Sequence, residues 1–293
     1  APISYSSKSQ LIHISRKLSL HAKLTQNGLT MEKKNIISKH IGILCAMPEE
    51  VGSTLENLKN IETKTYGDLK IHSGDWCFSN SSSKAINIHL SIAWSGWGKV
   101  SAARAATRLI SHQFNEVKID VIFFTGVAGA INSKLKQWDI IIPHKLIQHD
   151  MDARPLFKRY EIPALKTVKI KSNKSITSWT LSTLKNSKKD GSLKNFGNIY
   201  EGLIATGDKF ISNKNDIENI SKEMEDLFAV EMEGGSVAQV AKQEKIPFQI
   251  IRVISDEANE NSSEDFSKFL IKYNNHSAKL ISVLIENIES LPI

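Results

Sequence analysis

The chain has 293 residues, of which 41% are hydrophobic, and its formal net charge is +7. This composition supports a sizeable core in one large domain or two small ones, and no apolar stretch reaches the roughly 18 residues of a membrane helix. Two cysteines, Cys45 and Cys77, do not make a disulfide framework, which favours a reducing compartment. The sequence has no CxxC or HExxH motif, so it signals no metal site.

The basic excess is concentrated at the start of the chain. Residues 1–31 contain no acid and supply +4 of the +7 through Lys8, Arg16, Lys17 and Lys23. The remaining +3 is weak evidence for nucleic-acid binding, and we expect neither a nucleic-acid nor a membrane partner. Such a segment is typical of an organelle transit peptide or of translated upstream sequence before Met31, and the expected location is otherwise cytoplasmic. We predict that residues 1–35 are a mobile extension and that residues 36–293 form one domain.

The rest of the chain alternates between strand-like and helix-like segments. The first half predicts a strand at 41–46, a helix from Pro48, a strand at 85–94, a helix at 99–112, and strands at 120–125 and 139–147. The second half predicts a helix at 173–188, a strand at 198–205, a helix at 216–226, a strand at 229–232, a helix at 234–245, a strand at 248–255 and a long helix at 266–288. A long loop is expected from near Lys185 to Asn195. This alternation is typical of an α/β three-layer domain.

Acidic residues stand where three of the predicted strands end. The first strand leads to Glu50, a later one to Glu231 and Glu233, and the last to Asp256. Since α/β proteins bind ligands at strand ends, these carboxylates indicate a polar small molecule and acid–base chemistry. Each also has a purely structural interpretation: Glu50 would stabilise a helix N-terminus, and Ser255 with Asp256 would cap a helix.

Six motifs, in order, carry a resemblance to a known family: IGILCAMPEE, SGWGKVSAA, FFTGVAGAI, TGDKFI, AVEMEGGSVAQV and RVISDEAN. Over residues 41–270 the chain resembles the 5′-methylthioadenosine/S-adenosylhomocysteine nucleosidases of the nucleoside phosphorylase superfamily. The resemblance implies a central mixed twisted sheet flanked by helices, and a homodimer. It also implies hydrolysis of the N-glycosidic bond of these nucleosides, and of 5′-deoxyadenosine, without a cofactor. The products would be adenine and a 5-thioribose derivative, in methionine salvage and nucleoside catabolism.

The resemblance assigns the chemical roles as well. Glu50 matches the glutamate that holds and deprotonates the attacking water. Asp256 matches the general acid that protonates N7 of adenine, and Ser255 helps to place it. This proton transfer matters because adenine leaves poorly as an anion. Arg252 is expected to orient Glu50 or the water.

The same resemblance predicts the walls of a substrate pocket. Glu233 would accept hydrogen bonds from ribose hydroxyls, with Glu231 on the same strand face and Met232 packed on the sugar. Phe210 would stack on adenine, and the backbone of Ile211 would read the edge of the base. Three residues would form an apolar wall at the 5′ substituent: Met47, Trp97 and Phe266. Small residues would let the backbone approach the sugar: Val127, Ala128 and Gly129.

The chain departs from the family pattern at two positions. Val127 stands where many members carry Ser or Thr, and Trp138 stands where Gly is usual, which puts the exact substrate preference in doubt. The run His149-Asp150-x-Asp152 resembles a metal motif, but no further ligand follows at a suitable spacing. In the family a similar run leads into a segment that reaches the neighbouring subunit, and Leu156 or Phe157 is the expected contact.

Three other functions remain open from the sequence. A phosphorylase would need basic groups for its phosphate, which a carboxylate at Glu50 would repel. A hydrolase of another 6-substituted purine nucleoside, such as futalosine, would share the same residues. A non-catalytic binding or storage protein of the same fold could lose its acid or base freely, whereas Glu50, Glu233, Arg252 and Asp256 are all present.

Overall fold

The computed structural model describes residues 23–25, 28–30, 37–79, 85–224, 226–258 and 262–293. The chain divides into two compact units, residues 1–36 and 37–293. In the first unit, β1 (Lys23–Thr25) pairs antiparallel with β2 (Gly28–Thr30). The predicted mobility of residues 1–35 falls mostly on residues outside the described ranges. The second unit contains all the predicted site residues.

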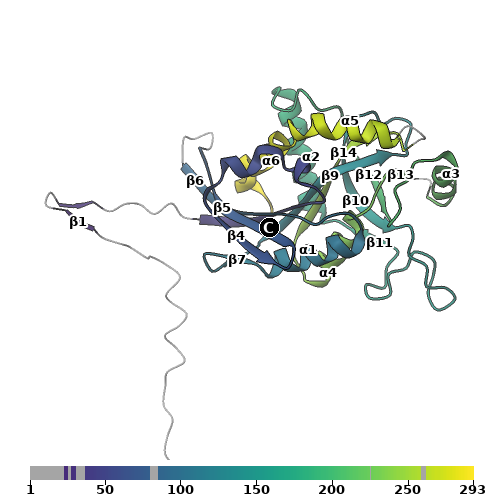
Figure 1. Cartoon of the computed structure of the whole chain (residues 1–293), viewed down its shortest axis with the longest axis horizontal. Helices are drawn as coiled ribbons and strands as arrows, with labels where there is room; N and C mark the ends of the chain where they lie inside the picture. Colours follow the sequence, from purple (N-terminus) through teal and green to yellow (C-terminus); the bar gives the residue numbers. More distant parts are fainter. Residues whose placement is uncertain (1–22, 26–27, 31–36, 80–84, 225, 259–261) are drawn as a thin grey trace, which may run out of the picture. The chain divides into compact units, whose positions relative to one another are not determined.

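A ten-stranded mixed sheet forms the centre of the second unit (Figure 1). Its strands are β3 (Ile37–Cys45), β4 (Lys59–Tyr66), β5 (Leu69–Ser79), β6 (Ala85–Trp94), β9 (Val121–Ala130), β10 (Ile140–Gln148), β11 (Lys169–Lys171), β12 (Ile199–Thr206), β13 (Leu227–Glu231) and β14 (Phe248–Asp256). Their order is β11-β10-β12-β13-β9-β3-β6-β5-β4, and β14 pairs with both β9 and β10. A separate ribbon joins β7 (Gln113–Phe114) to β8 (Val117–Lys118). All seven predicted strands are confirmed.

The strand pairings close part of the sheet into a ring. β14 runs parallel to β9 and antiparallel to β10, β10 and β12 are parallel, and β13 joins β12 to β9. On the other side of β9, β3 runs parallel to both β9 and β6. Because β3, β6, β9 and β14 run in the same direction, the loops at their carboxyl ends come together although they are far apart in sequence.

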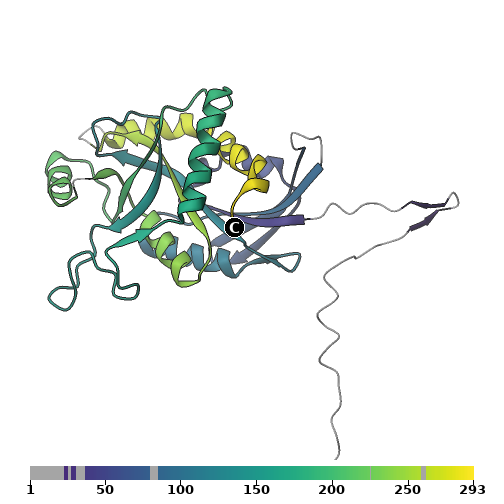
Figure 2. The same cartoon turned by 180° about the vertical axis from the view of Figure 1, so that it is seen from behind.

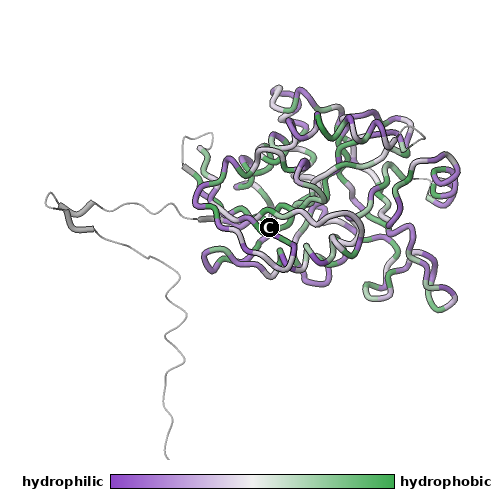
Figure 3. Tube along the Cα trace, in the orientation of Figure 1, coloured by the Kyte–Doolittle hydropathy of each residue, from purple (hydrophilic) through white to green (hydrophobic). Residues whose placement is uncertain are grey.

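Helices cover the sheet in two layers (Figures 1 and 2). On one side, α1 (Lys99–Ser111) packs against α4 (Gly234–Gln243). The other side carries α2 (Lys174–Lys189), α5 (Ser262–Asn274) and α6 (Ser277–Glu286). Neighbouring strand residues serve opposite layers, since Phe124 packs with the alanines of α1 whereas Phe123 packs with α2 and α5. The central strands are accordingly the most hydrophobic part of the trace (Figure 3).

The predicted helix at 266–288 is wrong in its continuity. The structure has two helices that break at Asn275 and His276, and α5 begins at Ser262. Ser277, the first residue of α6, is buried, and its hydroxyl donates to the carbonyl of Glu49 at 3.0 Å. The apolar pattern runs through the break because both helices pack on the same core, so periodicity alone does not show it.

Two further elements differ from expectation. The helix expected from Pro48 is a pair of short 3₁₀ turns, η1 (Pro48–Glu50) and η2 (Gly52–Asn57). The antiparallel pair of β4 and β5 was not predicted, because every residue of β4 is exposed or only partly buried and its sequence lacks an alternating apolar pattern. Beyond these, α2 continues to Lys189, so the loop expected from near Lys185 starts later. The last described element, η3 (Ile288–Ser290), is a 3₁₀ turn, and α3 (Lys214–Glu223) flanks β13 in sequence.

Trp138 has a left-handed backbone, with φ of 76°. This conformation explains why glycine suits the position, since a side chain there is strained. The indole packs against Phe269, with ring centroids 4.5 Å apart, and against Phe196 at 5.9 Å. The departure from the family pattern therefore adds a core contact behind the sheet and lines no part of the pocket described below.

Candidate active site

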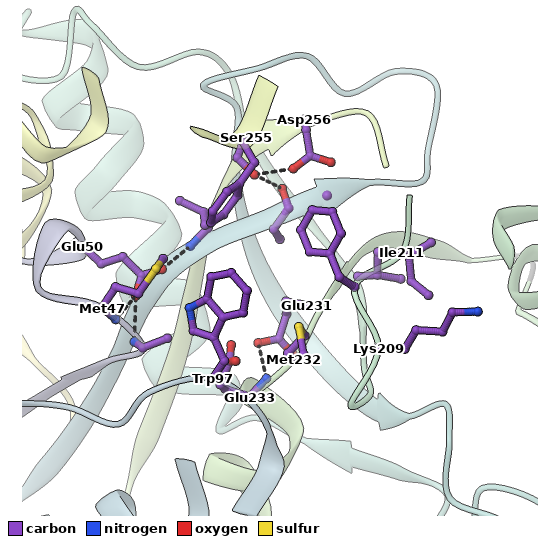
Figure 4. A pocket seen from close by; sticks show the side chains of 17 residues that line it. Met47, Glu50, Trp97, Lys209, Ile211, Glu231, Met232, Glu233, Ser255 and Asp256 are labelled. Atoms are coloured by element: carbon purple, nitrogen blue, oxygen red, sulfur yellow. Dashed lines mark hydrogen bonds between the residues drawn. The ribbon is translucent and has the colours of Figure 1, made fainter. Parts of the chain in front are cut away.

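A cavity opens where the ends of β3, β9, β13 and β14 meet the loops that follow β6 and β12 (Figure 4). It encloses about 560 Å³, including space open to solvent, which is within the range of small-molecule sites. Its lining residues are Ala46, Met47, Glu50, Trp97, Val127, Ala128, Gly129, Lys209, Phe210, Ile211, Val230, Glu231, Met232, Glu233, Ser255, Asp256 and Phe266. Every predicted pocket and catalytic residue is among them except Arg252.

Glu50 is held by backbone amides at the bottom of the cavity. It is 1% exposed, and its Oε2 accepts hydrogen bonds from the amides of Ala46 at 2.7 Å and Met47 at 2.9 Å. Its Oε1 accepts from the amide of Val127 at 3.0 Å. Burial raises the pKa of the Glu50 carboxyl, although the charge of Arg252 and these amides act in the opposite direction. One acceptor position on the carboxylate remains for a ligand or a water.

Asp256 ends β14 on a different wall of the cavity (Figure 4). Its Oδ2 accepts a hydrogen bond from the hydroxyl of Ser255 at 2.6 Å, and its Oδ1 accepts from the amide of Ala258 at 2.8 Å. Burial raises the pKa of the Asp256 carboxyl, and the bond from Ser255 partly opposes that rise. The carboxyl is therefore closer to the protonation range of a general acid than a solvated aspartate would be.

Glu231 and Glu233 share one buried cation. Nη2 of Arg252 donates to Oε2 of Glu231 and, at 3.4 Å, to Oε2 of Glu233. Glu231 also accepts from the hydroxyl of Thr206 and from the amide of Gly234 at 2.6 Å, so it caps α4. Most acceptor positions of the Glu231 carboxylate are therefore occupied by protein donors, which suits a structural role in fixing Arg252 and the start of α4.

Glu233 is less completely bound than Glu231. Its Oε1 accepts from the amide of Gly98 at 2.8 Å, while its Oε2 has only the long contact to Arg252. Burial and then the nearby Glu231 raise the pKa of the Glu233 carboxyl, and Arg252 opposes that rise. Glu233 therefore keeps acceptor capacity toward the cavity.

Arg252 lies behind the cavity and does not line it, with no exposed surface. A Cβ on Gly126 would collide with both its guanidinium and the carboxylate of Glu50, so both groups lie against the same face of that glycine. The hydrogen bonds of Arg252 nevertheless go to Glu231 and Glu233, and to the carbonyl of Thr125 at 3.4 Å. The charge of Arg252 acts to lower the pKa of the Glu50 carboxyl, and the expectation that Arg252 orients Glu50 or the water stays a prediction.

Aromatic rings form the outer wall of the cavity. Phe266 of α5 meets Trp97 and Phe210 edge to face, each with ring centroids 5.9 Å apart. Trp97 is 52% exposed, which is unusual for tryptophan in a monomer and places it at the mouth. With Met47, these rings give one side of the cavity an apolar surface that suits a flat base and an apolar substituent.

The sequence did not single out Lys209 as a lining residue. The signal was present, since Lys209 directly precedes Phe210 within the TGDKFI motif. Its Nζ donates to Asp216 at 2.8 Å, and Figure 4 shows the side chain extending away from the carboxylates. Lys209 is the only lysine or arginine among the residues that line the cavity, so the described walls offer no unpaired cation to an anion.

The remaining predicted residues lie outside the cavity. Leu156 is 84% exposed and Phe157 41% exposed, on the loop after β10. Asp152 of the same loop pairs with Arg154, whereas Asp150 pairs with Lys99 at 2.6 Å. Within the described residues, no group of three or more His, Cys, Asp or Glu side chains is placed to hold a metal ion, and no helix is long and apolar enough to cross a membrane.

Comparisons with known proteins identify the family of this chain. The family model described as "Phosphorylase superfamily" matches residues 40–286. The 5′-methylthioadenosine/S-adenosylhomocysteine nucleosidase of Buchnera aphidicola subsp. Schizaphis graminum is 33% identical over 251 residues, covering 85% of this chain and 97% of that protein.

Two solved structures extend the comparison. The S-adenosylhomocysteine nucleosidase of Streptococcus pyogenes, in complex with 5-methylthiotubericidin, superposes with a TM-score of 0.73 at 30% identity, covering 87% of this chain and 98% of that one. The futalosine hydrolase of Helicobacter pylori strain 26695 superposes with a TM-score of 0.70 at 30% identity, covering 85% and 97%. The similarity extends over nearly the whole second unit.

Proposed function

The chain belongs to the 5′-methylthioadenosine/S-adenosylhomocysteine nucleosidase family of the phosphorylase superfamily, and on this premise we propose that it hydrolyses adenine nucleosides that carry a 5′-thioether. The bond cleaved is the N-glycosidic bond of 5′-methylthioadenosine or S-adenosylhomocysteine. The products are adenine and a 5-thioribose derivative, as in methionine salvage. The observation that carries the proposal is one cavity with a buried carboxylate on two of its walls and an aromatic third wall.

In the proposed reaction, Glu50 acts as the base. Its free acceptor position binds a water, and the three backbone donors keep the carboxylate in a fixed orientation. The water oxygen bonds to C1′ as the bond from C1′ to N9 of adenine breaks, and one water proton passes to Glu50. A raised pKa makes this carboxylate a better proton acceptor near neutral pH than a solvated glutamate.

Asp256 acts as the acid in the same step. Its proton passes to N7 of adenine, so that the base leaves as a neutral molecule while the ribosyl ring carries oxocarbenium-like charge. Proton transfer of this kind contributes typically 10²–10⁴-fold, by order of magnitude. The free acceptor of Glu233 is available to the ribose hydroxyls.

The described walls favour water over phosphate as the nucleophile. Four buried carboxylates line the site, and Lys209, the one lining cation among the described residues, is paired with Asp216. Phosphate would enter against this charge. The apolar surface of Met47, Trp97 and Phe266 likewise favours a thioether over a charged or hydroxylated 5′ group.

A second candidate, hydrolysis of futalosine, is supported by the similarity to the Helicobacter pylori hydrolase. The two candidates share the acid, the base and the ribose site. A panel that compares 5′-methylthioadenosine, S-adenosylhomocysteine, 5′-deoxyadenosine and futalosine at equal concentration ranks them by kcat/KM. The apolar wall leads us to expect the highest value for a 5′-thioether.

A homodimer is part of the proposal. Leu156, Phe157 and Val100 are large apolar side chains that are 84%, 41% and 82% exposed, and Trp97 at the cavity mouth is 52% exposed. Apolar surface of this kind marks an interaction site. Sedimentation velocity tests the assembly, and a monomer at micromolar concentration would refute it. We further propose that the protein is located in the cytoplasm, or in an organelle if residues 1–31 act as a transit segment. We also propose that residues 1–35 are a mobile extension.

The decisive test measures adenine release from 5′-methylthioadenosine with and without added phosphate. Release in phosphate-free buffer, together with free methylthioribose, is the expected result. Release only in the presence of phosphate would make the protein a phosphorylase and remove Glu50 from its assigned role. Binding of adenine without release from any nucleoside of the panel would instead favour a non-catalytic binding protein.

A further inference from the structure

Three loops around the cavity are tied together by one small polar cluster. Lys99 follows β6, Asp150 follows β10, and Asp208 follows β12. Nζ of Lys99 donates to Oδ1 of Asp150 at 2.6 Å, and the amide of Asp208 donates to Oδ2 of Asp150 at 2.9 Å. Oδ1 of Asp208 accepts from the amide of Lys99 at 2.7 Å, which closes the ring of interactions.

The cluster lies outside the cavity but touches two elements that line it. Trp97 and Phe210 each stand two residues from a member of the cluster, Lys99 and Asp208 respectively. Between Trp97 and Lys99, Gly98 donates its amide to Oε1 of Glu233 at 2.8 Å. Two successive amides at the start of α1 are therefore held by carboxylates. The amide of Gly98 is held by Glu233, which lines the cavity, and that of Lys99 by Asp208, which does not.

The backbone at Gly98 does not hold this arrangement by itself. Gly98 has φ of 89°, a conformation that glycine adopts readily, and a Cβ there would stand 3.0 Å from Oδ1 of Asp208. A glycine of this kind leaves the direction of its amide to the contacts on either side. Asp208 supplies the contact on the far side, at the amide of Lys99.

We propose that Asp208 is a positioning residue, which fixes the turn at Gly98 so that Glu233 and Trp97 are held for the sugar and the 5′ substituent. This inference rests on the proposed function, because it assigns those two residues to the sugar side of a nucleoside. Adenine alone would contact the wall of Phe210, Ile211 and Asp256, which Asp208 does not hold through its side chain. Asp208 therefore affects nucleoside binding and leaves binding of the free base unchanged.

The variant Asp208→Ala separates these contributions. It removes the acceptor for the Lys99 amide and keeps the backbone amide that bonds to Asp150, so the loop after β12 stays anchored. Asp208→Asn keeps an oxygen at Oδ1 and should rescue the function. Asp152→Ala is the matched control. It also removes a carboxylate from a loop outside the cavity, but the hydrogen bonds of the Asp152 side chain go to Arg154.

The experiment uses the full chain and two probes, adenine and 5-methylthiotubericidin, the ligand of the Streptococcus pyogenes relative. Calorimetry gives Kd for each probe, and turnover of 5′-methylthioadenosine gives kcat and KM. For Asp208→Ala we expect KM and the Kd of 5-methylthiotubericidin to rise about tenfold, with kcat lowered less than about threefold and adenine Kd unchanged within about twofold. Asp208→Asn and Asp152→Ala should remain within about twofold of the wild type in every quantity.

Two results would overturn the inference. One is an unchanged Kd for 5-methylthiotubericidin in Asp208→Ala while the wild type turns over 5′-methylthioadenosine normally, which leaves the proposed function standing. The other is an equal loss of affinity for both probes, which indicates general disruption of the cavity. A wild type that neither releases adenine nor binds 5-methylthiotubericidin refutes the proposed function itself, and this inference with it.

Discussion

The guanidinium of Arg252 is bonded to the carboxylate of Glu231, and neither group is open to solvent. The pair crosses from β14 to the end of β13, and it leaves Glu50 to be held by backbone amides. One buried cation thus serves three buried carboxylates, and burial raises the pKa values of Glu50 and Glu233 in spite of its charge. The pKa values of the Glu50 and Asp256 carboxyls are both shifted upward from those of solvated carboxyls, the direction that acid–base chemistry near neutral pH needs.

Removal of this cation should be costly for the fold. We expect Arg252→Met to lower the free energy of unfolding by about 3–5 kcal/mol, because buried carboxylates are left without their partner. Urea unfolding measures the loss, and the double variant Arg252→Met with Glu231→Gln should recover part of it. A loss below about 1 kcal/mol would show that the pair contributes little to stability.

Glu50→Gln should remove nearly all turnover. The amide nitrogen of glutamine cannot accept from the backbone donors that now hold both oxygens of Glu50, and it is no base. We expect kcat to fall by about 10²–10⁴-fold, measured as adenine release. Glu49→Gln is the matched control, with the same charge change one residue away in η1. Similar losses in both variants would contradict the assignment of the base to Glu50.

Asp256→Asn should separate turnover from binding. Asparagine keeps an oxygen for the hydroxyl of Ser255 or the amide of Ala258, but it has no acidic proton to give to N7. We expect kcat to fall by about 10²–10⁴-fold while the Kd of adenine changes by less than about tenfold. Full-rate turnover by this variant would mean that another group protonates the base.

The dependence of kcat/KM on pH should be bell-shaped. Asp256 must be protonated to act as the acid, so activity falls as pH rises above its raised pKa. Glu50 must be ionised to act as the base, so activity falls as pH drops below its own raised pKa. A profile of kcat/KM against pH, at constant ionic strength, should lose its alkaline limb in any residual activity of Asp256→Asn. An alkaline limb that persists there would assign that limb to another group.

Stability should fall in mild acid because of His40. This buried side chain bonds to the carbonyl of Val117 at 2.9 Å and to the hydroxyl of Ser91 at 2.7 Å, and burial lowers the pKa of His40 to about 4. The unfolded chain, with a pKa near 6.5, binds the proton first, so stability present above about pH 6.5 is lost as the pH falls toward 4.

The expected loss from this residue is about 3 kcal/mol between those limits, measured by urea unfolding at a series of pH values. Burial also lowers the pKa values of His89 and His112, which act in the same direction. His40→Asn should be less stable near pH 7.5 and should show a flatter dependence on pH. A variant with the same slope as the wild type would show that His40 is not the group responsible.

Local sequence was sufficient for seven of the ten strands of the described sheet and insufficient for β4, β5 and β11. Strands such as β9 and β14 are buried along nearly their whole length, so their high content of apolar residues identifies them. The exposed β4 has no such signal, because its pairing with β5 holds it in place. The break between α5 and α6 also escaped prediction, since one apolar face continues across it.

The sequence by itself determined which carboxylates line the cavity, because Glu50, Glu231, Glu233 and Asp256 stand at strand ends within recognisable motifs. Only the tertiary structure decided their partners, since the contacts between Arg252 and Glu231 and between Asp208 and the amide of Lys99 join residues that are 21 and 109 positions apart. A local pattern reports what a residue can bond, whereas the closed pairing of the strands determines which group is within bonding distance. The same pairing sets the burial that raises the pKa values of Asp256 and Glu50, the proposed acid and base.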